Sequence, residues 1–225
     1  MYHSFAFGTR GGAEGGRWMK RSVWITFLVA EALLYCSFLF LDLQTSIDTK
    51  WLKFSSILLI AVMSFWSDNK TISAALCLTA TADVFLLVLN QWYGVGILLF
   101  FSVQLLYAFH LHSGKLLRIQ FILMIASIII TLITKHIELF ALGYITVFLL
   151  NLFRAASHIV QTRTRQAVLF FLGLLLFFCC DLCVGYYNIG FGSLWAFSRV
   201  AMWGFYLPGQ VLILLSAFVQ KGDPS

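Results

Sequence analysis

Two aspartates stand inside long apolar runs of this 225-residue chain, at Asp83 and Asp181. Asn90 follows the first aspartate and Asn188 follows the second at the same spacing. A carboxylate at the depth of a lipid-embedded helix costs about 2.5–3.5 kcal/mol on insertion scales, so such residues usually have a function or a partner. Two neighbouring carboxylates in a region of low dielectric tend to share one proton, which gives one acid and one base. That pair could catalyse the hydrolysis of an ether or an acetal.

The two aspartates also belong to similar stretches of sequence. A Gly-x-Gly pair follows each asparagine, at Gly94 and Gly96 in the first stretch and at Gly190 and Gly192 in the second. Each pair then leads to a leucine and a Phe-Ser dipeptide. The similarity predicts an internal repeat of a membrane-embedded unit of four helices.

Composition places these stretches in a membrane. The chain is 61% hydrophobic and only 11% charged, with a mean hydropathy of +0.91, whereas a soluble domain carries roughly a quarter charged residues. Its apolar runs are long and continuous, which favours helices over a β-barrel. The net charge of +6 does not indicate nucleic-acid binding, because the cations lie in loops beside apolar spans.

The predicted fold is all-α, a polytopic membrane helical bundle with about eight transmembrane helices. A basic tail at 1–22 precedes the transmembrane domain at 23–218, and a short tail at 219–225 follows it. The longest polar loop is expected at 154–166. The expected spans are 23–41, 51–66, 71–89, 94–109, 119–134, 139–153, 167–186 and 194–218.

Loop charges predict the orientation of the bundle. Eight spans place both termini on one side, and most of the 15 Lys and Arg residues fall on that side. The loops of the other side hold Lys50 and Lys135. The positive-inside rule therefore predicts cytoplasmic termini, in a bacterial inner membrane or an ER-type membrane.

This orientation predicts a common depth for the aspartates. Asp83 and Asp181 would each lie roughly 10 Å below the outer end of a helix, at about 1.5 Å rise per residue. Lys53 and Arg199 approach from the same outer side. A cluster of the four residues is allowed if their helices are neighbours. In that case the aspartates could simply tie helices together, which is the structural alternative to catalysis.

Other polar residues in the apolar runs suggest less. Glu31 and Tyr35 lie one turn apart, and we expect them to pair locally rather than to join the aspartates. Cys180 and Cys183 have a redox spacing, but inside a span we interpret them as small apolar filling. The histidines do not form a metal-binding pattern, so neither a metal nor a cofactor is expected.

Several short motifs resemble the YhhN family, over about residues 53–218. They are the run from Lys53 to Leu59, Ala82-Asp83-Val84-Phe85-Leu86, Gly96, Gln104-Leu105-Leu106-Tyr107, Cys180-Asp181, and the run from Tyr206 to Ile213. Members of that family have eight spans and include the animal lysoplasmalogenases, which hydrolyse the vinyl-ether bond of lysoplasmalogens to an aldehyde and a glycerophospho-base. The family often has His where this chain has Gln104.

The resemblance implies a lysolipid substrate and assigns roles to residues. Asp83 and Asp181 would be catalytic. The expected substrate-binding residues are Lys53, Gln104, Tyr107, Arg199, Tyr206 and Gln210. The leading hypothesis is a membrane hydrolase of lysoplasmalogen-like lysolipids. The alternatives are a transporter or lipid-binding protein without hydrolytic activity, and a structural membrane protein.

Overall fold

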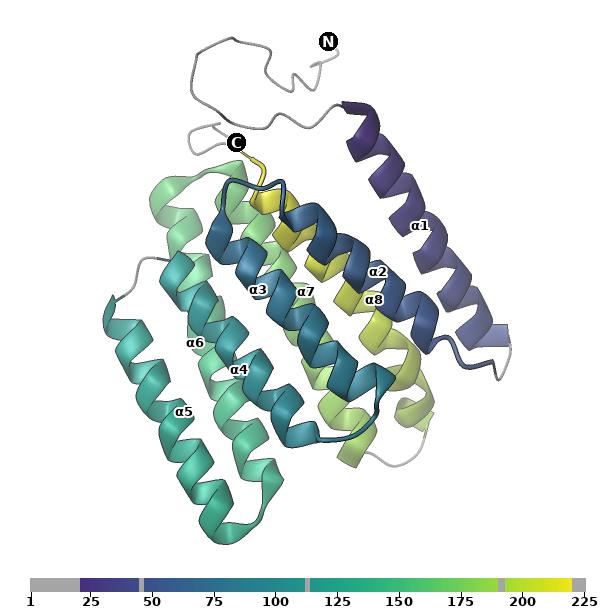
Figure 1. The fold of residues 1–225 in the computed structure, drawn as a ribbon. Helices are drawn as coiled ribbons and strands as arrows, with labels where there is room; N and C mark the ends of the chain where they lie inside the picture. The colour runs from purple at the N-terminus through teal and green to yellow at the C-terminus, as the bar shows by residue number, and fades with distance from the viewer. Residues whose placement is uncertain (1–20, 45–46, 112–113, 190–192, 220–225) are drawn as a thin grey trace.

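The computed structural model describes residues 21–44, 47–111, 114–189 and 193–219, which form a bundle of helices (Figure 1). The prediction of an all-α helical bundle is confirmed for these residues, whereas the predicted count of about eight transmembrane helices stays a prediction. Most of the predicted tail at 1–22 lies outside them. The elements are α1 (Arg21–Gln44), α2 (Lys50–Ser64), α3 (Lys70–Asp83), the π-helix η1 (Val84–Val88), α4 (Tyr93–His110), α5 (Gly114–Thr134), α6 (Ile137–Thr162), α7 (Arg165–Ile189) and α8 (Ser193–Ser216).

The surface of the bundle is that of an integral membrane protein. Six of the helical segments are long and apolar enough to cross a bilayer, and the 15-residue α2 is shorter than they are. Helix α5 exposes large apolar side chains along its length, such as Ile122 at 65% and Ile133 at 75%. Side chains of this kind are stable in contact with lipid and would associate in water.

Helix α1 lies at one edge of the bundle and α5 at the other (Figure 1). Helices α7 and α8 pack closely because glycines face each other between them. A Cβ atom on Gly173 would come within 2.8 Å of the carbonyl oxygen of Gly209. Small residues allow this approach of two backbones, which is a common means of association in membranes.

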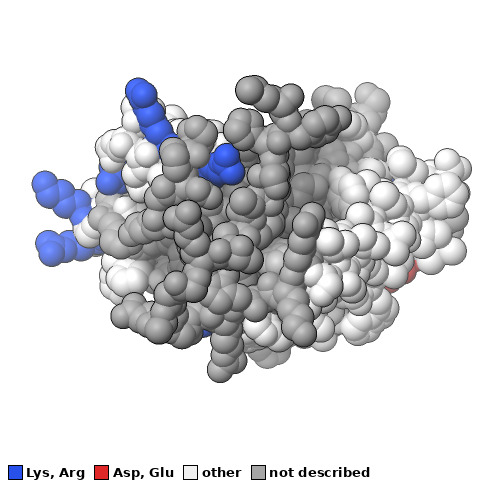
Figure 2. All heavy atoms as spheres, turned by 90° about the horizontal axis from the view of Figure 1, so that it is seen from above, with Lys and Arg blue, Asp and Glu red and all other residues white. Residues whose placement is uncertain are grey.

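The beginning of α1 and the end of α8 lie at the same end of the bundle (Figure 1). Lys and Arg side chains project from this end (Figure 2). Exposed cations at this end include Lys70 and Lys115, in the first turns of α3 and α5, and Arg163, between α6 and α7. The sequence predicts cytoplasmic termini from this distribution of Lys and Arg residues. The orientation itself stays a prediction.

The predicted polar loop at 154–166 is wrong over most of its length. Helix α6 continues to Thr162, and α7 begins at Arg165. The chain turns at Arg163, whose φ of 49° is left-handed. The apolar run of the expected span 139–153 ends at the predicted membrane boundary, but the polar residues after it can also form an α-helix. Hydropathy therefore did not locate the end of the helix.

Candidate functional site

Asp83 lies where a helix changes its geometry. It is the last residue of α3, and the five residues of η1 follow it directly. The amide of Leu89 donates to the carbonyl of Val84 at 2.8 Å, five residues back, as in a π-helix. Such π-turns inside helices are frequent at functional sites. The sequence of this segment holds no proline or glycine from which the turn could have been predicted.

A close helix contact supports the π-turn. A Cβ atom on Gly96 would come within 2.4 Å of the Leu86 side chain, so α4 can approach η1 only because residue 96 is glycine. The loop between them turns at Asn90 and Trp92, whose φ angles of 50° and 59° are left-handed. Gly96, the second glycine of the Gly-x-Gly motif, thus helps to position the helix segment that follows Asp83.

The Asp83 side chain is buried and held by a tyrosine. Only 5% of the residue is exposed. The hydroxyl of Tyr206, on α8, donates to Oδ2 of Asp83 at 2.5 Å. Tyr206 is itself buried, and its ring packs against Phe177 and Trp203 with both centroid distances at 5.5 Å. The rings fix the hydroxyl, and the hydroxyl fixes one oxygen of the carboxylate.

Asp181 has the same kind of partner on a different helix. It lies in α7 and is half-buried. The hydroxyl of the buried Tyr144, on α6, donates to its Oδ2 at 2.6 Å. The helix after Asp181 remains α-helical through Ile189, unlike the segment after Asp83. The two stretches of the predicted repeat therefore use similar contacts but differ in local geometry.

The two carboxylates lie within electrostatic range of each other. Cys180, which is buried, lies within range of both of them. A cluster of aromatic rings joins the two tyrosines: Phe148 packs against Tyr144 at 6.0 Å and against Phe177 at 5.1 Å. The site is thus a pair of acids, each fixed by a phenol, beside a wall of aromatic side chains.

The cluster of aspartates with Lys53 and Arg199 that the sequence allows is not held by ion pairs among the described residues. Lys53 Nζ lies 2.6 Å from Asp42 Oδ2, and it also stacks on the Trp203 ring at 4.9 Å. The Arg199 side chain is exposed on α8. Asp42 takes the lysine because α1 extends to Gln44 and carries Asp42 to the beginning of α2. Among the described residues, neither Asp83 nor Asp181 forms an ion pair.

Gln104 is fully buried and belongs to a network of amides. Asn151 Nδ2 donates to both the backbone carbonyl and Oε1 of Gln104 at 2.8 Å, and Gln120 Nε2 donates to Asn151 Oδ1 at 2.7 Å. Gln104 also lies within interaction range of Tyr144, which holds Asp181. The sequence did not indicate Asn151 or Gln120, because their role depends on contacts between α4, α5 and α6.

Tyr107 and Gln210, two other predicted binding residues, are also fully buried. Tyr107 lies within interaction range of Thr79, which is one turn before Asp83. Gln210 lies one turn after Tyr206, and its amide has no hydrogen-bond partner among the described residues. These residues occupy the layer of the bundle next to the Asp83–Tyr206 contact, on the side of the termini.

The expected local pair of Glu31 and Tyr35 is wrong. The Tyr35 hydroxyl donates to the carbonyl of Gly204 at 3.1 Å, and Glu31 Oε2 accepts a hydrogen bond from Ser56. Both side chains therefore bind neighbouring helices instead of each other. The free carbonyl on α8 attracts Tyr35, because Pro208, four residues later, has no amide hydrogen to donate to it.

Within the described ranges, no group of His, Cys, Asp and Glu could hold a metal ion. The five cysteines are free.

One of three comparisons with known proteins finds a match. The model of the YhhN family matches residues 49–217 of the chain. The match contains both aspartates, their tyrosine partners, and the amide network, and it begins after α1. Searches of curated proteins and of solved structures found no match.

Proposed function

Because the chain belongs to the YhhN family, we propose that it is a membrane-embedded hydrolase that cleaves the vinyl-ether bond of lysoplasmalogen-like lysolipids. The family resemblance motivates the substrate. The chemistry is supported by one observation above all: Asp83 and Asp181 lie within electrostatic range, and no described cation neutralises them. A structural pair would normally be compensated by a positive charge, whereas an acid–base pair needs one proton and one free carboxylate.

The tyrosines leave part of each carboxylate available for chemistry. Tyr206 and Tyr144 each donate to an Oδ2 atom, so the Oδ1 atoms can face the substrate or a water molecule. Asp83 is buried and Asp181 is half-buried, so Asp181 is the more accessible of the two carboxylates. We therefore assign proton donation to Asp83 and activation of water to Asp181.

The proposed reaction begins with transfer of a proton from Asp83 to the vinyl carbon remote from the ether oxygen. The resulting oxocarbenium-like cation is stabilised by the Asp181 carboxylate. Asp181 then takes a proton from water as the water oxygen bonds to the carbon next to the ether oxygen. The product of this step is a hemiacetal.

The hemiacetal then collapses and both aspartates recover their initial states. Its carbon–oxygen bond to the glycerol breaks, and Asp181 returns its proton to the departing oxygen. The hemiacetal hydroxyl gives its proton to Asp83 as the aldehyde carbonyl forms. One water molecule is consumed, and no metal or redox step is required.

Exposed Arg199 is the better candidate for the substrate phosphate, because Lys53 is already paired with Asp42. Gln104, Tyr107 and Gln210 would support the site from the side of the termini.

The experiment is aldehyde release from a lysoplasmalogen by purified protein. Asp83→Asn and Asp181→Asn should each reduce the rate at least about 100-fold, since general acid–base catalysis typically contributes 100- to 10,000-fold. Asp48→Asn, which changes an exposed acid outside the site, should retain full activity. Equal release by the wild type and both site variants would refute the mechanism.

A transporter or lipid-binding protein is the second candidate. It is favoured by irregular helix geometry beside polar residues, at η1 after Asp83 and at Pro208 within α8, because transporters commonly build their sites at irregular points of helices. Movement of a lysolipid across proteoliposomes without release of aldehyde would support it over the hydrolase.

A further inference from the structure

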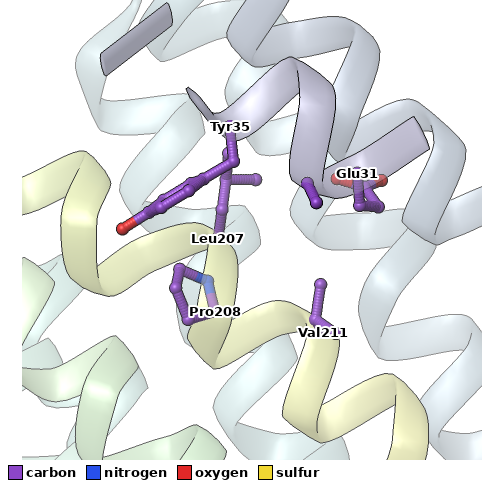
Figure 3. Close-up of a pocket in the computed structure, with 6 residues that line it drawn as sticks. Glu31, Tyr35, Leu207, Pro208 and Val211 are labelled. Atoms are coloured by element: carbon purple, nitrogen blue, oxygen red, sulfur yellow. The ribbon is translucent and has the colours of Figure 1, made fainter. Parts of the chain in front are cut away.

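A pocket lies between α1 and α8. Its volume is about 130 Å³, several times the roughly 10–15 Å³ that one water molecule needs. Figure 3 shows Glu31 and Tyr35 on α1 facing Leu207, Pro208 and Val211 on α8, and Ala32 completes the lining. The α1 wall of the pocket precedes the residues that the family model matches, whereas its α8 wall lies within them. The lining includes neither aspartate and neither of their tyrosine partners.

The walls of this α1–α8 pocket are fixed by hydrogen bonds. Pro208 leaves the Gly204 carbonyl without its helical donor, and the Tyr35 hydroxyl replaces that donor. In Figure 3 the Tyr35 ring points away from Glu31, over the ribbon of α8. Tyr35 therefore ties α1 to α8 and leaves the pocket between itself and Glu31 unfilled.

Glu31 is the polar residue of the pocket whose hydrogen bonding is incomplete. It is 5% exposed and lies near the middle of α1. Ser56 donates to Oε2, whereas Oε1 is buried and has no hydrogen-bond partner among the described residues. Because Glu31 lines the pocket, a ligand bound there could supply the missing contact.

The surroundings of Glu31 determine the chemistry of that ligand. No described cation pairs with Glu31, and an isolated charge within an apolar span is costly, so the neutral carboxylic acid is the favoured form. A carboxylic acid that accepts from Ser56 at Oε2 can donate from Oε1. The ligand atom should therefore be an uncharged acceptor oxygen, and the apolar lining suits an alkyl chain behind it.

The bundle gives such a molecule access from the membrane. Helix α1 stands at the edge of the bundle (Figure 1) and exposes apolar side chains beside Glu31, such as Leu33 at 63%. A single-chain lipid could thus reach the pocket laterally. The limited volume suits a chain end and not a phospholipid head group.

We propose that the α1–α8 pocket binds the uncharged oxygen end of a single-chain lipid, a fatty alcohol or fatty aldehyde, through a hydrogen bond from Glu31. This binding does not depend on hydrolysis. A fatty aldehyde would also be the apolar product of the proposed reaction, so the pocket could hold that product after cleavage.

The test is photo-crosslinking of the full-length protein in lipid nanodiscs with a 16-carbon alcohol that carries a diazirine next to its hydroxyl. The cross-links should map to 31–35 or 207–211 by mass spectrometry. Hexadecanol and hexadecanal should each compete with the probe, and hexadecane should not. Competition by hexadecane equal to that by hexadecanol, or cross-links elsewhere, would overturn the proposal.

Matched variants separate the donor from the cavity. Glu31→Gln retains a donor and should keep most of the labelling, whereas Glu31→Leu should reduce it at least about threefold, the effect of losing one hydrogen bond. Ala32→Phe should fill the pocket and reduce labelling while Glu31 remains, and Leu33→Phe on the exposed face should have no effect. Equal labelling of all variants would contradict the site.

Competition by a charged amine tests whether Glu31 is a protonated acid or a carboxylate. Hexadecylamine should compete less well than hexadecanol, and Glu31→Gln should not change that order. Stronger competition by the amine, lost in Glu31→Gln, would show that Glu31 binds a cation and would overturn the uncharged occupant. Failure of aldehyde release would leave all these results unchanged, so the two proposals can fail separately.

Discussion

Replacing Tyr206 by phenylalanine removes the hydroxyl that holds Asp83 and retains the ring. The ring contacts with Phe177 and Trp203 should survive, because they involve the aromatic carbons. The change therefore isolates a single hydrogen bond of 2.5 Å. Tyr144→Phe is its matched partner, since it removes the 2.6 Å hydrogen bond to Asp181.

The expected magnitudes differ because the two aspartates differ in exposure. Asp83 is buried, so Tyr206→Phe leaves a polar oxygen unsatisfied and should lower the free energy of unfolding by about 1–3 kcal/mol. Asp181 is half-buried, and in the proposed site its exposed side faces water that can replace the Tyr144 hydroxyl, so Tyr144→Phe should cost less than about 1 kcal/mol. If the same energy positions Asp83 in the transition state, kcat/KM for Tyr206→Phe should fall about 5- to 150-fold.

The assay combines equilibrium unfolding in mixed micelles with initial rates of aldehyde release. Tyr206→Phe should be the more damaging change by both measures. A Tyr206→Phe protein with wild-type stability and rate, or a larger loss in Tyr144→Phe, would refute the assignment of Asp83 as the buried acid that a phenol positions.

Three further changes test the packing around the site. Asp42→Asn should lower the free energy of unfolding by about 3–5 kcal/mol, because it leaves the buried Lys53 unpaired. Adding Lys53→Met should restore much of the loss, and no rescue in the double variant would contradict the ion pair. Gly173→Ala should cost about 1–3 kcal/mol in the same unfolding assay, because its Cβ meets the backbone of α8. The control Gly185→Ala, which has open space around it, should be neutral or stabilising, and equal effects of the two variants would be inconsistent with the close helix contact. Asn151→Leu should cost about 1–3 kcal/mol by stranding the amide of Gln120, and Gln120→Leu added to it should recover part of that loss if the network is correct.

Much of the fold could be predicted from the sequence because lipid imposes a simple rule. Every spanning segment must be long, apolar and internally hydrogen-bonded. The run 71–89 therefore predicted α3 with η1, and the run 94–109 predicted α4, each to within about a turn. The rule fails beyond the membrane boundary, where α6 continues through polar residues to Thr162.

The site was predictable only in part. The cost of an aspartate in an apolar helix identified Asp83 and Asp181, but spacing along one helix cannot show which side chain on another helix meets them. Tyr144 was therefore missed, and Tyr206 was chosen from the family resemblance and not as the partner of Asp83. The pairing of Lys53 with Asp42 was missed because Asp42 was assigned to the loop between the first two expected spans. No feature of the local sequence predicted the π-turn after Asp83.

The central claim is that an aspartate protonates the vinyl carbon of a lysolipid, and the position of that proton in the product tests it most directly. Hydrolysis of a lysoplasmalogen in D₂O, followed by immediate reduction of the aldehyde, should yield a fatty alcohol with one deuterium from solvent on its second carbon. Aldehyde formed without deuterium at that carbon, or no aldehyde at all, would contradict the proposed chemistry.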